Sequence, residues 1–262
     1  MVYRTLSIVQ VMTQLSGLFW FILMLVPLIL LQRLLHREIQ AVFLILTRDT
    51  RVTMGIFAML FLPGVFLHEL SHFVVAKILQ VRTGQFSIFP RSLPDGRLQL
   101  GYVETAKSDM LRDSLIGAAP LIVGTLFVAY VAIYHLQLRL LWDAFRNGQF
   151  DLFWLGVRTL PQTPDFYLWF YLVFTVSSTM MPSESDRHAW LELLISIAVL
   201  FSITLLFGAG PWMLSNVAPR LSTFLSSVAG IFGLSVFVHI LLILPTALVH
   251  KLVARATGLD VA

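Results

Sequence analysis

Two histidines and a glutamate in one short stretch are the residues of this chain best suited to chemistry. They occur in the sequence His68-Glu69-Leu70-Ser71-His72. On a helix, a four-residue spacing puts both imidazoles on one face, where they can share a tetrahedral zinc ion. Glu69 stands beside the first histidine, where it can act on a metal-bound water as a general base instead of binding the metal. The pattern therefore predicts a metal site with a general base beside it.

The composition places these residues in a lipid bilayer. Of the 262 residues, 58% are hydrophobic and 12% are charged, whereas soluble domains carry about 25% charged residues. This excludes a soluble enzyme, a nucleic-acid-binding module and a disordered tail. The net charge of +4 indicates basic loops facing anionic lipid, and no nucleic-acid partner is expected. Without cysteine, thiolate metal ligands and cysteine nucleophiles are excluded as well.

We predict an all-α polytopic membrane protein that forms a single membrane domain over residues 1–262. About 20 apolar residues of helix cross the hydrocarbon core of a bilayer, so charge-poor runs indicate the spans. Six such runs lie at about 7–32, 54–77, 114–137, 166–183, 190–208 and 222–250. Glycines and a proline, at Gly208, Gly210 and Pro211, predict a helix break before the last span.

Two segments between the spans have patterns of their own. After the second span, alternating apolar and polar residues on both sides of Leu93-Pro94-Asp95-Gly96 predict a β-hairpin at 84–104. After the third span, aromatic residues at three- and four-residue spacing predict a segment at 139–160 that lies in the membrane interface. Gly148 in the middle of this segment leaves a plain connecting loop as the alternative.

A zinc site with two histidines needs a third protein ligand at the same membrane depth. The end of the fourth span supplies the candidates, because Pro182 and small polar residues predict unwound chain there, which is tolerated where it lines a cavity. Asp186 and Glu184 can both reach the metal from this segment, and His188 is a rival. The residues alone leave these three alternatives open.

In motif and layout the chain resembles the site-2 protease family of intramembrane zinc metalloproteases. The His68–His72 motif matches the family's first motif completely, and the hairpin at 84–104 lies where the family has β structure. Gly117-Ala118-Ala119-Pro120 is similar to the family's Gly-Pro element. The resemblance covers roughly residues 54–195 and implies Asp186 as the third ligand.

The resemblance implies a zinc-dependent endopeptidase that hydrolyses peptide bonds in transmembrane or membrane-proximal segments of other proteins. His68, His72 and Asp186 would hold one zinc ion, and Glu69 would be the general base. The hairpin edge would pair with an extended substrate by strand addition. The implied partners are a membrane-protein substrate and the lipid bilayer, and a regulatory partner is left open.

The chain departs from the family around the third ligand. Ser178 stands where the family has asparagine, Pro182 is one residue out of register, and Arg187 replaces the glycine that follows the aspartate. These changes keep a second interpretation open, namely a non-proteolytic metal-binding or structural membrane subunit that retains the fold. Glu69 argues against it, because a purely structural metal site has no need of a base.

Lysine and arginine counts give an orientation. If six spans alternate, ten of these residues lie on the side of the hairpin and both termini, and eight lie on the other side. The positive-inside rule then predicts a multi-pass protein of the cytoplasmic membrane, with the hairpin and both termini in the cytoplasm.

Overall fold

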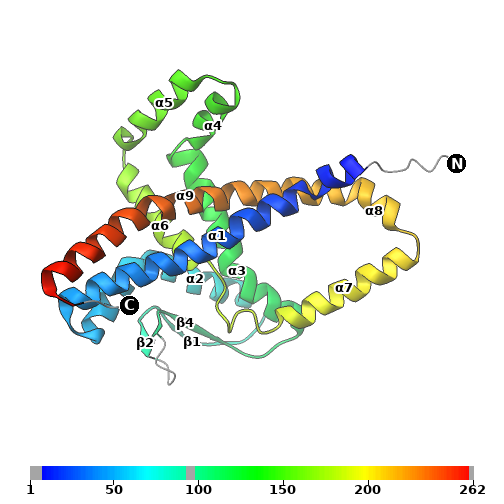
Figure 1. The fold of residues 1–262 in the computed structure, drawn as a ribbon. Coiled ribbons are helices and arrows are strands. Elements are labelled where there is room, and N and C mark those ends of the chain that lie inside the picture. Colours follow the sequence, from blue (N-terminus) through cyan, green and yellow to red (C-terminus); the bar gives the residue numbers. More distant parts are fainter. Residues whose placement is uncertain (1–7, 93–97, 260–262) are drawn as a thin grey trace.

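The computed structural model of the chain describes residues 8–92 and 98–259 (Figure 1). The helical elements are α1 (Ile8–Thr47), α2 (Thr50–Ile78), α3 (Met110–Tyr130), η1 (Val131–His135), α4 (Leu138–Arg146), α5 (Phe150–Thr159), η2 (Leu160–Gln162), α6 (Phe166–Thr179), α7 (Trp190–Leu206), α8 (Gly210–Asn216) and α9 (Ala218–Thr257). The strands are β1 (Thr83–Ser87), β2 (Arg91–Ser92), β3 (Leu98–Gln99) and β4 (Tyr102–Thr105).

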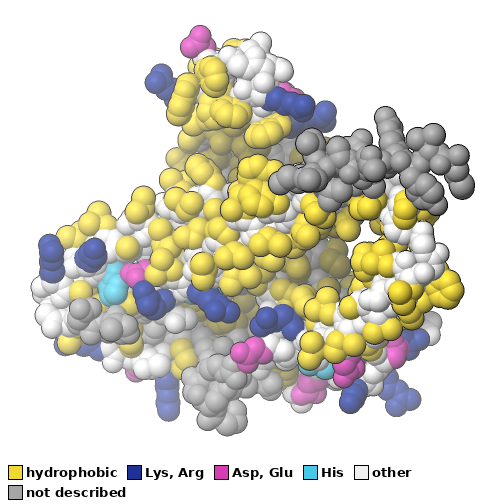
Figure 2. Space-filling view, turned by 45° about the vertical axis from the view of Figure 1, so that its right-hand side comes forward, with side chains coloured by type: hydrophobic (Ala, Val, Ile, Leu, Met, Phe, Trp, Pro, Cys, Tyr) yellow, Lys and Arg dark blue, Asp and Glu magenta, His cyan; other side chains and the backbone are white. Residues whose placement is uncertain are grey.

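The helices are those of a membrane protein. Four of those described are long and apolar enough to cross a bilayer: α1, α2, α3 continued by η1, and α9. A fifth results if α7 and α8, which meet at a bend of 113°, count as one span, whereas α6 has only 14 residues. The predicted count of six is therefore not confirmed. Apolar side chains cover much of the surface, and charged ones gather toward its lower edge, at one end and on the projecting helices α4 and α5 (Figure 2).

Helices α1 and α9 lie side by side and run in the same direction (Figure 1). The Gly17 N–H donates to Ser222 Oγ over 3.0 Å near the start of both helices, and His250 Nδ1 lies 2.7 Å from Glu38 Oε2 near their ends. Six alternating spans would make the first and last antiparallel, so the predicted topology, with both termini on one side, disagrees with this pairing. The prediction ended the first span at Gln32, but α1 continues to Thr47, with Gln32 donating to the Ser178 carbonyl of α6 and Glu38 paired with His250 of α9.

Helices α2, α3 and α6 form the bundle that carries the site. Gly64 on α2 lets the backbone of α6 approach closely, since a Cβ there would collide with the Thr175 carbonyl. Phe61 on α2 is fully buried and packs against Phe174 of α6, with ring centroids 5.3 Å apart. Val128 and Val173 extend this core to α3. The core holds the three helices in a fixed relation beside the site.

The predicted hairpin is present as two short antiparallel ladders. In the outer ladder β1 pairs with β4, with Phe86 opposite Val103, and in the inner one β2 pairs with β3. The predicted turn at Leu93–Gly96 lies outside the described residues. The hairpin follows α2 directly and lies over its second half (Figure 1).

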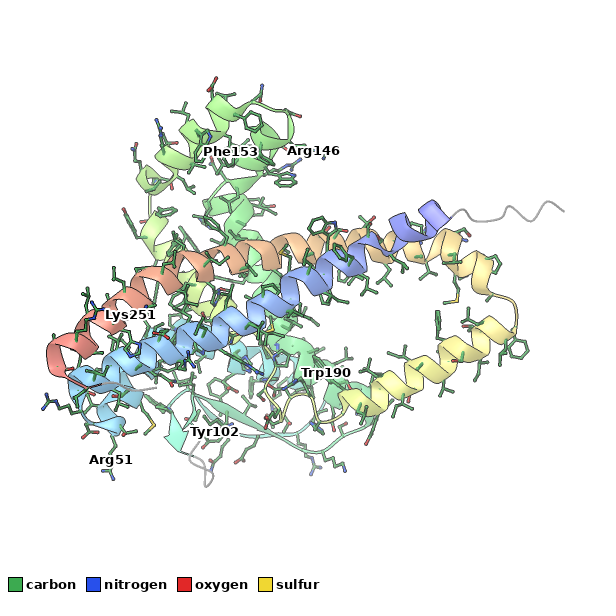
Figure 3. The ribbon with its side chains drawn as sticks, in the orientation of Figure 1. Arg51, Tyr102, Arg146, Phe153, Trp190 and Lys251 are labelled. Carbon is green, nitrogen blue, oxygen red and sulfur yellow. The ribbon has the colours of Figure 1, made fainter. Side chains whose placement is uncertain are left out.

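The segment predicted to lie in the interface forms a helical hairpin, α4 and α5, that projects from the bundle (Figure 3). Gly148 makes the turn between them with a φ of +71°, a conformation that favours glycine. Phe145 and Phe153 pack across the hairpin with ring centroids 5.5 Å apart, and no residue of α4 or α5 is buried. The segment is therefore helical on both sides of Gly148, while its position in a bilayer stays a prediction.

Candidate metal centre

The two motif histidines lie one turn apart on α2, and each is oriented by a backbone carbonyl from another helix. His68 Nδ1 lies 2.6 Å from the Thr179 carbonyl at the end of α6, and His72 Nδ1 lies 2.8 Å from the Ile116 carbonyl on α3. A carbonyl only accepts hydrogen bonds, so each Nδ1 carries the proton. Both Nε2 atoms consequently present lone pairs, and they lie 3.2 Å apart.

Asp186 reaches the histidines from the unwound chain between α6 and α7. The helix ends at Thr179, as the sequence predicts from Pro182, and α7 starts at Trp190. The Ser183 N–H donates to Asp186 Oδ2 over 2.7 Å and fixes the carboxylate. Gly117 on α3 permits the close approach of this loop, because a Cβ at that position would collide with the Asp186 carbonyl.

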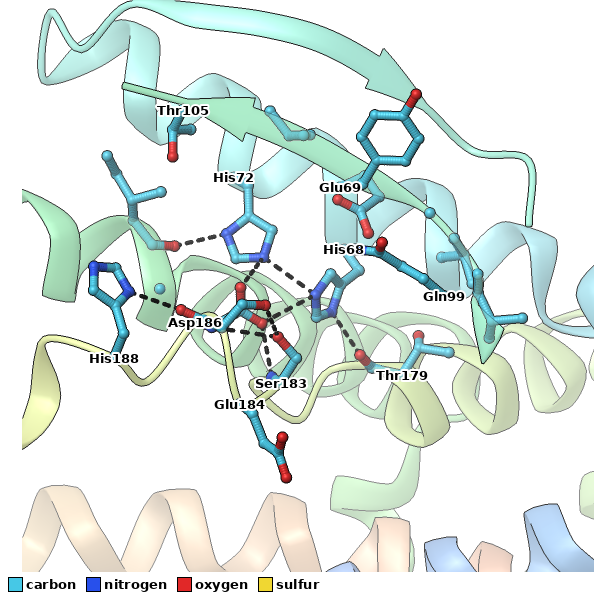
Figure 4. A pocket seen from close by; sticks show the side chains of 18 of the residues that line it. His68, Glu69, His72, Gln99, Thr105, Thr179, Ser183, Glu184, Asp186 and His188 are labelled. Carbon is cyan, nitrogen blue, oxygen red and sulfur yellow. Dashed lines mark hydrogen bonds and ion pairs between the residues drawn. The ribbon is translucent and has the colours of Figure 1, made fainter. Parts of the chain in front are cut away.

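The three side chains lie close enough together to share one metal ion. Asp186 Oδ1 is 3.3 Å from His72 Nε2, and Oδ2 is 3.7 Å from His68 Nε2 (Figure 4). Zinc bonds of 2.0–2.1 Å at the tetrahedral angle put neighbouring ligand atoms about 3.3 Å apart. Among the described residues, this is the one group of three or more His, Asp or Glu side chains that could hold an ion. Two imidazoles and a carboxylate are also ligands that zinc prefers.

The charge of Asp186 suits this role. Burial by itself raises the pKa of its carboxyl, whereas the hydrogen bond from the Ser183 N–H stabilises the ionised form and lowers this pKa. The side chain is 15% exposed, so the carboxylate is largely shielded from water. A carboxylate must be deprotonated to bind a metal, and the hydrogen bond from Ser183 favours this ionised form.

Glu69 lies beside the ligand group without belonging to it. Glu69 is 7% exposed, and its carboxylate points into the same pocket (Figure 4). Gly101, just before β4, lies against its side chain, since a Cβ at Gly101 would be 2.8 Å from Glu69 Cγ and 2.9 Å from Val65 Cγ1. The hairpin therefore closes one side of the pocket directly over the predicted base.

The pocket has a volume of about 750 Å³ and separates the hairpin from the α1 helix. Its walls include Gln99–Val103 from the hairpin, Gln32 from α1 and the loop Ser183–Asp186. Strand β4 lies next to His68, His72 and Asp186, and its residues Tyr102, Val103 and Thr105 line the cavity (Figure 4). The cavity is large enough to admit an extended peptide segment beside the three ligands.

The two rival ligands are placed elsewhere. Glu184 points away from the histidines (Figure 4). His188 Nδ1 lies 2.7 Å from the Ser185 carbonyl, and its Nε2 lies 3.4 Å from Asp113 Oδ2 on α3. Asp113 in turn accepts a hydrogen bond from the Ser108 N–H over 3.2 Å. His188 and Asp113 thus hold the Asp186 loop against α3.

Several contacts around the site escaped the sequence reasoning. The carbonyls of Ile116 and Thr179 orient the histidines, and backbone groups carry no sequence signal. Gln32 donates its amide to the Ser178 carbonyl, although the sequence suggested only the end of a span there. Ser178 Oγ lies 3.0 Å from His239 Nε2 on α9. For Gln32 and Ser178, the signal available in the sequence was a polar residue inside an apolar run.

No protein family, curated protein or solved structure matches this chain.

Proposed function

We propose that the chain is an intramembrane zinc metallopeptidase that hydrolyses peptide bonds in transmembrane or membrane-proximal segments of other proteins. The supporting observation is the convergence of two Nε2 lone pairs and a carboxylate at the spacing of tetrahedral zinc ligands. Glu69, one residue after the first ligand, supplies a base in the same pocket.

Each residue has a separate task in this proposal. His68, His72 and Asp186 would hold one zinc ion, whose chemistry when bound is to acidify a water molecule and to polarise a carbonyl. Glu69 takes the proton of the attacking water and delivers it to the nitrogen of the leaving amine. The Ile116 and Thr179 carbonyls keep both rings in the tautomer that leaves Nε2 free for the metal.

We further propose that the substrate binds as an extended strand along β4. Strand β4 forms a two-stranded antiparallel ladder with β1 in the described part of the chain. Tyr102 and Val103 of β4 line the pocket above the metal ligands. Strand addition there would hold a locally unwound peptide next to Glu69. Proline at Val103 should block such pairing, and unchanged cleavage in that variant would count against this binding mode.

The decisive experiment measures bound zinc and cleavage of a membrane-protein substrate in the same preparations. Glu69→Gln should retain zinc and lose cleavage, because the amide cannot accept the proton of water. His72→Ala should lose both. Glu104→Gln, which changes an exposed acid on β4, is the matched control and should keep both. Cleavage at the wild-type rate by Glu69→Gln would refute the mechanism.

A second candidate function is a metal-binding or structural membrane subunit without protease activity. It is favoured by Ser178, whose hydroxyl is buried against His239 instead of being presented to a substrate. This subunit would bind zinc in the wild type and cleave none of the membrane substrates tested. Zinc-dependent cleavage that disappears in Glu69→Gln would exclude it.

We also propose that the hairpin faces the cytoplasm in a multi-pass protein of the cytoplasmic membrane. Lys77, Arg82, Lys107 and Arg112 flank the hairpin, as the positive-inside rule expects of a cytoplasmic side. The chain has no cysteine, so single cysteines can be introduced without a background. A cysteine at Lys107 should be shielded from an impermeant thiol reagent in intact cells, and labelling there would reverse this orientation.

A further inference from the structure

A shallow groove lies at the corner where α8 meets α9, at the end of the molecule away from the hairpin of α4 and α5 (Figure 1). It has a volume of about 520 Å³. Its lining residues are Trp212, Asn216, Val217, Arg220, Leu221 and Phe224. None of these residues belongs to the metal centre.

Most of the residues that line the groove are apolar, and among those described Arg220 carries the charge. Val217, Arg220, Leu221 and Phe224 follow one another at spacings of three, one and three residues, so they lie along one face of α9. Leu221 and Phe224 are 52% and 64% exposed. From Arg220 toward the C-terminus of α9, the groove continues along the exposed side chains of Leu221 and Phe224, and this order suits an amphiphilic ligand.

Arg220 is isolated from other charges. Between residues 193 and 250 it is the only Asp, Glu, Lys or Arg in the sequence. It is exposed, and in the described part of the chain it makes no ion pair. An arginine bordering a long apolar span lies at the membrane interface, where its fork of N–H donors matches the oxygens of a phosphate.

Trp212 is a second indication that the groove lies at the depth of the lipid headgroups. It is 61% exposed on α8 and shares the groove with Arg220. Tryptophan is enriched where a protein surface meets lipid headgroups, because the indole has an apolar body and a polar N–H. Asn216 places a polar side chain beside them.

We propose that this groove binds the phosphate of an anionic phospholipid, with Arg220 on the phosphate and an acyl chain along Leu221 and Phe224. Among the described residues that line the groove there is no acidic side chain to pair with the ammonium group of a zwitterionic lipid. A net anionic lipid such as phosphatidylglycerol is therefore selected over phosphatidylcholine. This site is independent of the proposed protease activity.

Native mass spectrometry of the purified full chain tests the proposal, with phosphatidylglycerol and phosphatidylcholine of identical acyl chains. The tightest lipid site of the wild type should bind phosphatidylglycerol with about tenfold higher affinity than phosphatidylcholine, as a charge-assisted contact predicts. Arg220→Gln should lose this preference, and Arg220→Lys should keep part of it because the charge remains without the fork. Arg255→Gln, at an exposed arginine near the other end of α9, is the matched control.

Fluorescence quenching locates the lipid without any change at Arg220. The emission assigned to Trp212, taken as wild type minus Trp212→Phe, should be quenched by brominated phosphatidylglycerol at a lower lipid fraction than by brominated phosphatidylcholine. Equal quenching by the two lipids, or an unchanged preference in a folded Arg220→Gln variant, would overturn the proposal. A dimer interface that shields Trp212 from both lipids would also overturn the proposal.

Discussion

Replacing Gly101 with alanine tests whether the hairpin positions the proposed base. The new Cβ would lie 2.8 Å from Glu69 Cγ, 2.9 Å from Val65 Cγ1 and 3.0 Å from the Ser87 carbonyl oxygen. Ordinary van der Waals contact begins near 3.4 Å, so Glu69 Cγ or the hairpin has to yield by about 0.6 Å. Neighbours on both sides of the new methyl group leave it no other space.

A displacement of this size acts on the reaction more than on the metal. A misplacement of about 1 Å costs roughly a hundredfold in rate, so we expect kcat to fall by about tenfold to a hundredfold. The three atoms nearest to the new Cβ belong to Glu69, Val65 and Ser87, so zinc content should stay at the wild-type level.

The assay is single-turnover cleavage of a membrane substrate in proteoliposomes, with zinc measured in the same samples. Gly84→Ala is the matched control on the same hairpin, because its Cβ would meet the exposed Glu104, whose Oε2 at 2.7 Å can rotate away and whose Cβ at 3.1 Å has to shift by a few tenths of an ångström, and neither atom belongs to the pocket. An unchanged kcat in a folded Gly101→Ala protein would refute the idea that the hairpin holds Glu69 in place. An equal loss of zinc and activity would show that the whole centre had collapsed.

Three further outcomes are expected. Asp186→Ala should lose zinc while Glu184→Ala keeps it, as metal analysis of purified protein can show; the reverse result would move the third ligand. Asp113→Ala should weaken zinc binding about tenfold, because it removes the side chain that His188 contacts and that helps hold the Asp186 loop; a competition titration with a chelator measures this, and an unchanged affinity would show that the loop does not depend on this contact. Phe61→Ala should destabilise the bundle by about 3 kcal/mol, near the low end for such cavities because the surrounding lipid is itself apolar; equilibrium unfolding in mixed micelles measures the change, and a value near zero would contradict the burial of this ring.

Local patterns in the sequence were enough for several parts of the fold. Composition and apolar runs identified a membrane protein, because chain length and hydrophobicity act locally. The break before α8 followed from Gly208 and Pro211, and the unwound segment after Thr179 followed from Pro182. The i, i+4 spacing placed His68 and His72 on one helix face without any tertiary information.

Other parts depended on contacts that are distant in the sequence. The end of α1 was misplaced at Gln32 because a polar residue within an apolar run looks like a boundary until its partner is known, and that partner is the Ser178 carbonyl on α6. The parallel pairing of α1 and α9 likewise depends on contacts such as Glu38 with His250, more than 200 residues apart.

The sequence by itself determined that a bilayer surrounds this chain and that two histidines and a glutamate share one helical turn within it. Only the tertiary structure decided which acidic residue joins them. Asp186, Glu184 and His188 are close neighbours in the chain, and their side chains diverge because Ser183 turns Asp186 inward while Asp113 holds His188 outside the ligand group. Proximity in sequence limits which residues can reach a site, but the backbone path of the loop and the close approach at Gly117 select the one that does.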